Sequence, residues 1–364
     1  MKKLITSTEA LRPALKKLAQ AVSAKPTVPI LSNLYLQARE GEMELITCDL
    51  ELTISCLLPC ECKQPFEMLV PFDFLSKLIG LLGNEPLEIE YHSSTKAIVI
   101  AEGQKYEMGG LEKVKDYPNV PEVPVKNTME LDEEFMEWLH RSMATVSTDD
   151  LKPAMTQACL ELDKTGITIA STNAHCLFRR FFPKPFEGNA ECILISPRIA
   201  KAMKGVDKAM LSWRQNHVAL TADKVKVIAT RLDAKFPDYR VVIPDSKPTL
   251  RLHRQDLLGA LYKSSLFNQR QVSLHFPEGE NNRFTVHTED ADMARVSDVT
   301  VAGAYEGNTR EIAFEPKLFE TVLDQVPFDD IRLHIDGPIR GVVITSEEEP
   351  NYLGLIMPLM LNTK

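Results

Sequence analysis

Seven cysteines are the side chains in this sequence best suited to bind a soft metal or to act as nucleophiles. Only Cys56, Cys60 and Cys62 form a cluster. Cys60 and Cys62 would share one face of a strand, but no second pair of cysteines or histidines lies at the spacing of a zinc finger. We therefore expect thiols that pack as small apolar side chains, and neither a metal nor a cofactor is predicted.

A catalytic site is not predicted either. Cys159, His175 and Cys176 are candidates for a thiol and its base, but Cys176 directly follows His175 and would point to the opposite face of a strand. The sequence has no Walker loop, no G-x-S-x-G elbow and no H-E-x-x-H helix. Acidic pairs such as Asp149-Asp150 lie in loop-like contexts, where solvated carboxylates are usual. The sequence indicates a protein that is not an enzyme.

Three markers recur in the same order along the chain and define the elements that would position these side chains. The first is an amphipathic helix with an N-cap or an acidic first turn, near Thr8, Asp132 and Arg254. The second is a strand that runs into a polar turn, at Leu45–Asp49, Thr168–Asn173 and Phe284–Glu289. The third is a helix that begins at a proline, at Pro71, Pro197 and Pro316.

Two proline-containing connectors separate the repeats. One reads Phe-Pro-Asp-Tyr-Arg-Val-Val-Ile-Pro from Phe236 to Pro244, and a fainter copy, Asp116-Tyr-Pro-Asn-Val-Pro, lies about one domain length earlier. Proline fixes φ, and the aromatic residue of each connector could pin it onto a neighbouring module. The predicted class is α+β, with two helices packed on antiparallel sheet in each of three similar domains, at residues 1–122, 123–245 and 246–364.

Composition narrows the class of protein. The 364 residues are 44% hydrophobic and 26% charged, as is typical of soluble globular proteins. No run approaches the roughly 18 apolar residues of a membrane span, and the opening Met1-Lys-Lys-Leu-Ile-Thr-Ser soon turns polar, so we expect a cytoplasmic protein without a membrane partner. The net charge of -9 argues against a surface that grips nucleic acid by counterion release.

Five motifs, in order, resemble the bacterial sliding clamp family, the β subunit of DNA polymerase III. They are Lys25-Pro-Thr-Val-Pro-Ile-Leu-Ser-Asn, Asp116-Tyr-Pro-Asn-Val, Thr172-Asn-Ala-His-Cys-Leu, Phe236-Pro-Asp-Tyr-Arg and Leu355-Ile-Met-Pro-Leu-Met-Leu. The resemblance spans the chain and implies a DNA clamp fold, in which two three-domain chains form a head-to-tail homodimeric ring around duplex DNA. It also implies a processivity factor whose partners, the replicative polymerase, the clamp loader and repair proteins, bind through short linear motifs.

The resemblance implies three sites. DNA would face Lys25, Arg198 and Lys201; topological linkage supplies the residence time, so an acidic protein needs only a lining of cations. Further candidates for this lining are the cations of the predicted helices, Lys16, Lys17, Lys77, Arg141, Lys204, Lys263 and Lys317. At the dimer interface, Leu266 and Phe267 of one chain would meet Phe74, Leu75 and Leu78 of the other. The peptide-binding groove between the second and third domains would comprise Met155, Thr172, His175, Leu177, Pro237, Val242, Ile356, Met357, Pro358 and Leu359.

The sequence departs from the family at the groove, where Asn173 and Cys176 stand in place of a common Asp and Arg, and Asn362–Lys364 follow the usual last residue. Other interpretations stay open. The cations also suit solvated helix faces, the apolar residues suit cores, and the last motif suits a final strand. Two other functions are alternatives: a three-module enzyme with a site at a domain junction, and a protein-binding scaffold that does not encircle DNA.

Overall fold

The computed structural model of the chain describes residues 2–23, 28–93, 95–109, 111–121, 127–267, 270–279, 282–290 and 294–360. The chain forms two compact units. Unit 1 comprises Met1–Glu137 with Arg198–Asp233, and unit 2 comprises Trp138–Pro197 with Ala234–Lys364. The finer division into three domains stays a prediction. Among the described residues, no helix has the length and apolar character needed to cross a membrane.

Unit 1 contains two antiparallel sheets. The five-stranded sheet has the order β5 (Glu61–Cys62), β1 (Lys2–Ser7), β7 (Pro86–Ser93), β8 (Lys96–Ala101) and β9 (Gln104–Gly109). The eight-stranded sheet has the order β10 (Thr128–Leu131), β15 (Ala209–Trp213), β16 (His217–Ala222), β17 (Val225–Thr230), β4 (Leu52–Pro59), β3 (Glu42–Cys48), β2 (Asn33–Arg39) and β6 (Phe66–Pro71).

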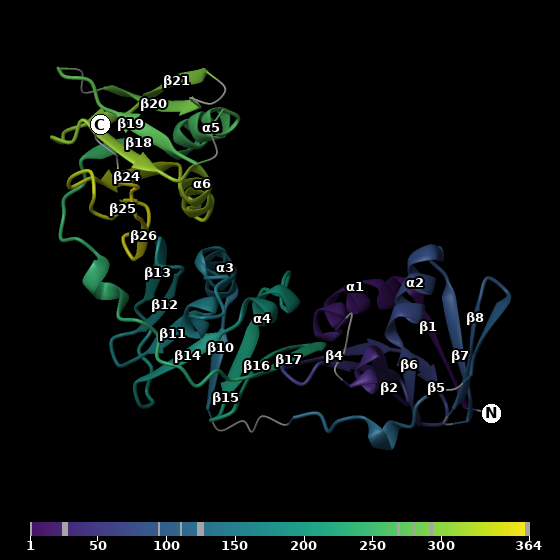
Figure 1. Ribbon diagram of the computed structural model, residues 1–364. Helices are drawn as coiled ribbons and strands as arrows, with labels where there is room; N and C mark the ends of the chain where they lie inside the picture. Colours follow the sequence, from purple (N-terminus) through teal and green to yellow (C-terminus); the bar gives the residue numbers. More distant parts are fainter. Residues whose placement is uncertain are drawn as a thin grey trace. The chain divides into compact units, whose positions relative to one another are not determined.

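The helices of unit 1 begin where the sequence predicts them. The Ser7 hydroxyl accepts a hydrogen bond from the Ala10 amide at 3.1 Å and caps α1 (Thr8–Leu18), while Pro71 immediately precedes α2 (Phe72–Leu81). The two helices contact each other and lie on one side of the strands of this unit (Figure 1). The short α4 (Pro197–Ala202) enters unit 1 at Arg198. Three single turns complete the unit: η1 (Ala19–Ala21), η2 (Pro29–Ser32) and η3 (Val114–Asp116).

The first connector is held by its aromatic residue, as predicted. Tyr117 follows η3, is buried, and packs with Ile30, Leu31 and Leu69. Its ring centroid lies 5.5 Å from that of Tyr35. Burial of an aromatic side chain contributes on the order of 2 kcal/mol, which is enough to order a short connector.

Unit 2 also contains two antiparallel sheets. The nine-stranded sheet has the order β14 (Glu191–Ile195), β11 (Ala158–Leu162), β12 (Ile167–Thr172), β13 (Cys176–Phe182), β26 (Tyr352–Ile356), β25 (Val342–Thr345), β24 (Asp330–His334), β18 (Leu250–His253) and β22 (Ala304–Tyr305). The four-stranded sheet has the order β21 (Arg295–Ala302), β20 (Arg283–Asp290), β19 (Val272–His275) and β23 (Glu311–Phe314).

The predicted helices of the second and third repeats are also present. They are α3 (Glu133–Ser142), which spans the division between the units, α5 (Arg254–Ser265) and α6 (Pro316–Asp324), whose first residue is the predicted proline. Within unit 2, α5 and α6 contact each other beside the strands (Figure 1). The single turns of this unit are η4 (Met143–Thr145), η5 (Pro153–Thr156) and η6 (Tyr239–Val242). Antiparallel sheets with few helices confirm the α+β class.

An aromatic cluster with a buried charge forms the core of unit 2 behind β13 and β26. The Trp138 ring stacks on Tyr352 with centroids 5.4 Å apart, and Phe178 lies 5.8 Å from Trp138. The Arg180 guanidinium lies 5.2 Å from the centre of the Trp138 ring and is paired with the Glu349 carboxylate at 3.0 Å. Because only 4% of the Arg180 side chain is exposed, its charge depends on this carboxylate for compensation.

We expect Glu349→Gln to lower the free energy of unfolding by about 3 kcal/mol, because the buried Arg180 charge loses its counter-charge while the shape of the side chain is kept. Urea unfolding followed by tryptophan fluorescence measures this change. Glu278→Gln is the matched control: Glu278 pairs with Arg310 at 3.3 Å, but 89% of its side chain is exposed, so its loss costs about 0.5 kcal/mol or less. Equal effects of the two substitutions would contradict the importance of the buried pair.

Candidate functional site

The predicted groove residues divide between the two faces of the nine-stranded sheet. Thr172 pairs with Leu177, and Leu177 pairs with Leu355, so these three side chains share one face. Ile356 pairs with Cys176 and points to the other face, where both side chains are buried. Ile356 therefore supports the sheet from behind and offers no surface to a partner.

The turn between β12 and β13 is closed by side-chain hydrogen bonds. The Thr172 hydroxyl donates to the Cys176 carbonyl at 2.7 Å, and the Asn173 amide oxygen accepts from the backbone N–H groups of His175 and Cys176 at 2.9 and 2.8 Å. The turn leaves the His175 side chain exposed, while its carbonyl accepts from the Met357 amide at 2.7 Å. Two predicted members of the groove, His175 and Met357, are thus brought together.

The two departures from the family pattern remove charge from this turn. Asn173 supplies, without a negative charge, the acceptor that the turn requires. Cys176 is buried, and this burial raises the pKa of its thiol to about 11, so the group stays neutral at ordinary pH. The Asn173–Cys176 turn therefore has no fixed charge on its side chains.

The C-terminal segment passes from one sheet to the other sheet of unit 2. After β26, Met357, Pro358 and Leu359 are half-buried, and the Leu359 amide donates to the Ala313 carbonyl of β23 at 2.7 Å. Met360 is 80% exposed. The segment is therefore both a final strand and, beyond Ile356, an accessible apolar edge.

The sequence analysis missed the loop that precedes β25. A Cβ atom added to Gly341 would lie 3.1 Å from the Met357 sulfur, so this position is close to a predicted groove residue. Ile339, two residues earlier, is 62% exposed. The sequence signal was weak, since an apolar residue in the loop Asp336-Gly-Pro-Ile-Arg-Gly carries no periodic pattern.

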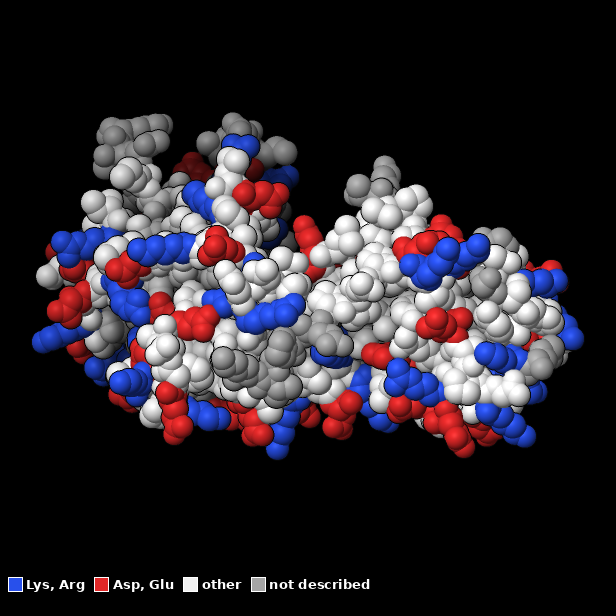
Figure 2. Space-filling view, turned by 90° about the horizontal axis from the view of Figure 1, so that it is seen from below, with Lys and Arg blue, Asp and Glu red and all other residues white. Residues whose placement is uncertain are grey.

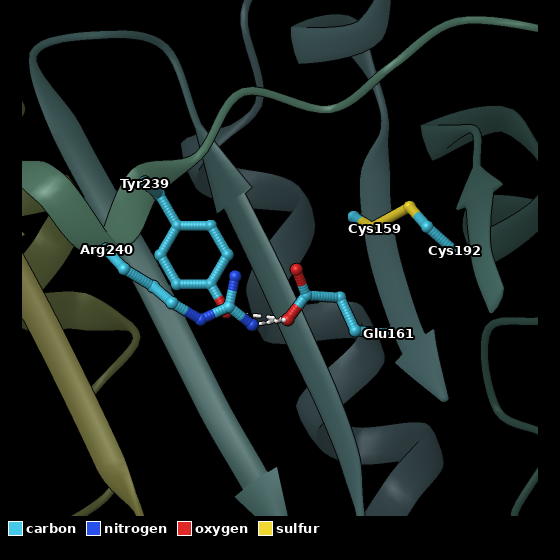
Figure 3. Close-up of a disulfide and its surroundings, with 5 residues drawn as sticks. All are labelled: Cys159, Glu161, Cys192, Tyr239 and Arg240. Atoms are coloured by element: carbon cyan, nitrogen blue, oxygen red, sulfur yellow. Dashed lines mark hydrogen bonds and ion pairs between the residues drawn. A yellow bond between two sulfur atoms is a disulfide. The ribbon is translucent and has the colours of Figure 1, made fainter. Parts of the chain in front are cut away.

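The second connector is fixed on β11 by two side chains that converge on Glu161 (Figure 3). The Tyr239 hydroxyl donates to Glu161 Oε2 at 2.9 Å, and the Arg240 guanidinium donates to the same oxygen at 2.5 Å. Tyr239 is buried, and this burial raises the pKa of its phenol, so the hydroxyl keeps its proton. Pro237 and Val242, both predicted groove residues, remain exposed on the connector.

Met155 lies at the end of a closed loop in the same unit. Its carbonyl accepts from the Ser147 amide at 2.8 Å, and its amide donates to the Lys152 carbonyl at 2.9 Å. The side chain is half-buried, while Leu151 at the loop tip is exposed. Met155 is therefore held on a rigid backbone and keeps part of its surface.

Two of the seven cysteines are not thiols, contrary to the expectation from sequence. Cys159 of β11 and Cys192 of β14 form a disulfide (Figure 3). Cys192 pairs with Glu161, two residues from Cys159, so the cysteines lie diagonally on one face with their Cα atoms 6.2 Å apart, within the range of a disulfide. The other five cysteines are free and buried. Among the described residues, no group of three or more His, Cys, Asp or Glu is arranged to hold a metal ion.

The predicted DNA-facing cations differ in their surroundings. Lys201 on α4 is exposed, whereas Arg198 donates to the Asp49 carboxylate and to the Gln20 carbonyl. Lys25 lies outside the described residues. Figure 2 shows Lys and Arg interspersed with Asp and Glu over the visible face, and neither sign dominates a broad area of the coloured residues there.

The residues predicted for the dimer interface are partly on the surface. Leu266, which caps α5, is 79% exposed, and Phe267 is 37% exposed. In unit 1, Phe74 is half-buried, but Leu75 and Leu78 belong to the core of that unit because they lie on the inner side of α2. Leu81, at the end of the same helix, is 87% exposed and was not singled out from the sequence.

Comparison with known proteins gives a consistent result. Residues 2–121 match the family described as DNA polymerase III beta subunit, N-terminal domain. The beta sliding clamp of Bacillus subtilis is 21% identical over 95% of this chain and 96% of its own length. The beta sliding clamp of Chlamydia pneumoniae is 24% identical and covers 99% of both chains.

Solved structures share the whole fold. The DNA polymerase sliding clamp of Bacillus subtilis superposes with a TM-score of 0.89, at 20% identity and with 99% of each chain covered. The DnaN sliding clamp of Pseudomonas aeruginosa, bound to griselimycin, has a TM-score of 0.90, also at 20% identity, and covers 99% of this chain and 100% of its own. The likeness in sequence and in fold runs from one end of the chain to the other, and the chain belongs to the bacterial sliding clamp family.

Proposed function

We propose that this protein is a DNA sliding clamp: a homodimeric ring that encircles duplex DNA and tethers the replicative polymerase and other DNA-processing proteins. Each chain would contribute three domains, at residues 1–122, 123–245 and 246–364. The observation that carries the proposal is the unbroken likeness to sliding clamps over at least 95% of the chain. The protein would work in the cytoplasm beside DNA, as a processivity factor without catalytic residues or a cofactor of its own.

Two edge strands support a head-to-tail contact. β9 ends the five-stranded sheet of unit 1, and β21 ends the four-stranded sheet of unit 2, so each has one edge without a strand partner in the described part of the chain. Such an edge can pair with a second chain, and different patches at the two ends of a chain suit a heterologous contact. The exposed side chains of Leu81 in unit 1 and of Leu266 and Phe267 in unit 2 would supply apolar contact area.

The double substitution Leu266→Lys with Phe267→Lys should yield monomers, because it places two charges in the proposed contact while both side chains are accessible in the single chain. Sedimentation velocity at micromolar concentration would then give the mass of one chain. Leu151→Lys, at a loop tip where the side chain is 90% exposed, is the control and should leave the dimer intact. A dimeric double variant would place the interface elsewhere.

DNA would be held by linkage with a weak cationic lining. With a net charge of -9, the chain lacks the basic surface that strong non-specific binding requires, so residence on DNA must come from another source. Exposed Lys201 is the cation of α4 that we propose to face DNA. A closed ring needs no high affinity, because a duplex without ends cannot leave it.

Protein loaded on nicked circular DNA should remain bound in 1 M salt and be released after a restriction enzyme makes the DNA linear. A complex that depends on about six phosphate contacts would instead lose about three orders of magnitude in affinity over a fourfold rise in salt. Gel filtration of the loaded DNA, before and after cutting, measures retention. Equal loss from circular and linear DNA would favour the alternative of a scaffold that does not encircle DNA.

Partner proteins would bind the apolar surface of unit 2. Leu177 and Leu355 form its floor on one sheet face, while Met155, Pro237, Val242, Met357, Pro358 and Leu359 are partly or fully accessible around it. Thr172 and His175 supply polar groups. An extended peptide with apolar anchors suits such a surface, since buried apolar anchors supply most of the affinity and a few polar groups set orientation.

Met357→Ala with Leu359→Ala should weaken binding of a Gln-Leu-x-Leu-Phe peptide by about 10- to 100-fold, since each truncation removes an anchor contact worth about 1 kcal/mol or more. Fluorescence polarisation measures the affinity. Substitution is preferable to deletion, because Leu355 and Ile356 are buried in the sheet. Leu81→Ala, an equally apolar change in unit 1, is the control. Unchanged affinity in the double variant would show that peptides bind elsewhere.

A further inference from the structure

The helix α4 is too short to be stable by itself, and both of its ends are held by cations that belong to the contacts of unit 1. It has six residues, well below the length at which an isolated helix persists in water. At its first turn, the Arg198 guanidinium donates to the Gln20 carbonyl at 2.7 Å and to the Asp49 carboxylate, with Glu51 at 3.7 Å. Arg198 therefore ties α4 to the segments that follow α1 and β3.

Lys17 holds the opposite end of the same helix. From α1, its ammonium group donates to the carbonyls of Ala202 and Lys204 at 3.1 and 2.8 Å. These are the last carbonyls of the helix, where the helix dipole favours a positive charge. Loss of water around the half-buried ammonium lowers the pKa of Lys17, which shows that the group is committed to the protein and withdrawn from solvent.

Asp49 is built to receive Arg198. One of its carboxylate oxygens accepts from the backbone N–H groups of Glu51 and Leu52 at 3.1 and 2.8 Å, and the other oxygen pairs with Arg198. Only 15% of the Asp49 side chain is exposed. Moving Arg198 to a phosphate would leave this shielded carboxylate without its counter-charge, which is costly.

The strands beside α4 make the same connection by backbone pairing. β17 pairs with β4 from Val225–Cys56 to Ala229–Leu52, and the Thr230 amide donates to the Glu51 carbonyl at 2.8 Å. Residues 198–230 are therefore joined to residues 17–57 twice, once through the sheet and once through the two cations. The strand pairing sets the sheet, and the cations set the position of the helix.

We infer that Arg198 and Lys17 are positioning residues that fix α4 against α1, and that Arg198 is not a phosphate ligand. The proposed function enters this inference at one point, in that α4 is positioned to present Lys201 to DNA. Two of the cations that the sequence suggested for the DNA-facing lining thus bind the protein itself, and exposed Lys201 remains free to meet the duplex.

Thermal unfolding combined with the salt dependence of binding to a short linear duplex separates the two roles. Arg198→Gln should lower Tm by several degrees and leave the slope of log K against log salt unchanged, because no phosphate contact is lost. Lys17→Met should behave in the same way, and Arg198→Lys should recover part of the Tm. The control Lys201→Gln should leave Tm unchanged and reduce the slope by about 0.9, the value for one phosphate contact.

Asp49→Asn tests the partner, since asparagine keeps the acceptor for the two backbone N–H groups and removes the charge. It should lower Tm as Arg198→Gln does, and the double variant should be no less stable than either single variant. A reduction of the slope by about 0.9 in Arg198→Gln with unchanged Tm, or additive Tm losses in the double variant, would overturn the inference. Failure of the unmodified protein to bind DNA would refute the proposed function instead, and the Tm measurements would still decide the role of Arg198.

Discussion

The backbone pairing of β13 with β26 is the constraint on which the candidate partner site depends. It joins residues 176–180 to residues 352–356, so two segments far apart in sequence become neighbours. Because side chains alternate along strands, this register sends Phe178 and Tyr352 to the face that holds Trp138, and Leu177 and Leu355 to the other face. A register shift of one residue would exchange the two sets and remove both the aromatic core and the apolar floor.

The connectors are ordered by single aromatic residues and not by extensive packing. Tyr239 combines burial of its ring with a hydrogen bond to Glu161, and Arg240 reinforces the same carboxylate. Because these two side chains point toward β11, neighbouring Val241 and Val242 remain exposed. The connector thus acts as part of the candidate binding surface as well as a link, which explains why its short sequence combines prolines, an aromatic residue and valines.

Local signals in the sequence were sufficient for the helices. Prolines 71, 197 and 316 and the Ser7 cap each precede a helix, because they act through the first turn alone. Pairing between distant strands was not predictable in this way. Ile356 was expected beside Leu177, yet alternation in the sequence cannot say which face of a strand meets a partner and which meets a core. The disulfide between Cys159 and Cys192 was missed for the same reason, since it depends on the register of β11 with β14.

The surroundings of a cation decide its role, and charge counts taken from sequence cannot supply them. Arg198 and Lys201 lie on one short helix and look equivalent in the sequence, but the first faces a shielded carboxylate and the second faces solvent. Only the second can exchange its counterions for a phosphate without exposing an unpaired charge in the protein. The number of cations available to DNA is therefore smaller than the number on the helices. For a ring that holds DNA by linkage this is an advantage, because each additional phosphate contact would slow sliding while adding nothing that closure of the ring does not already provide.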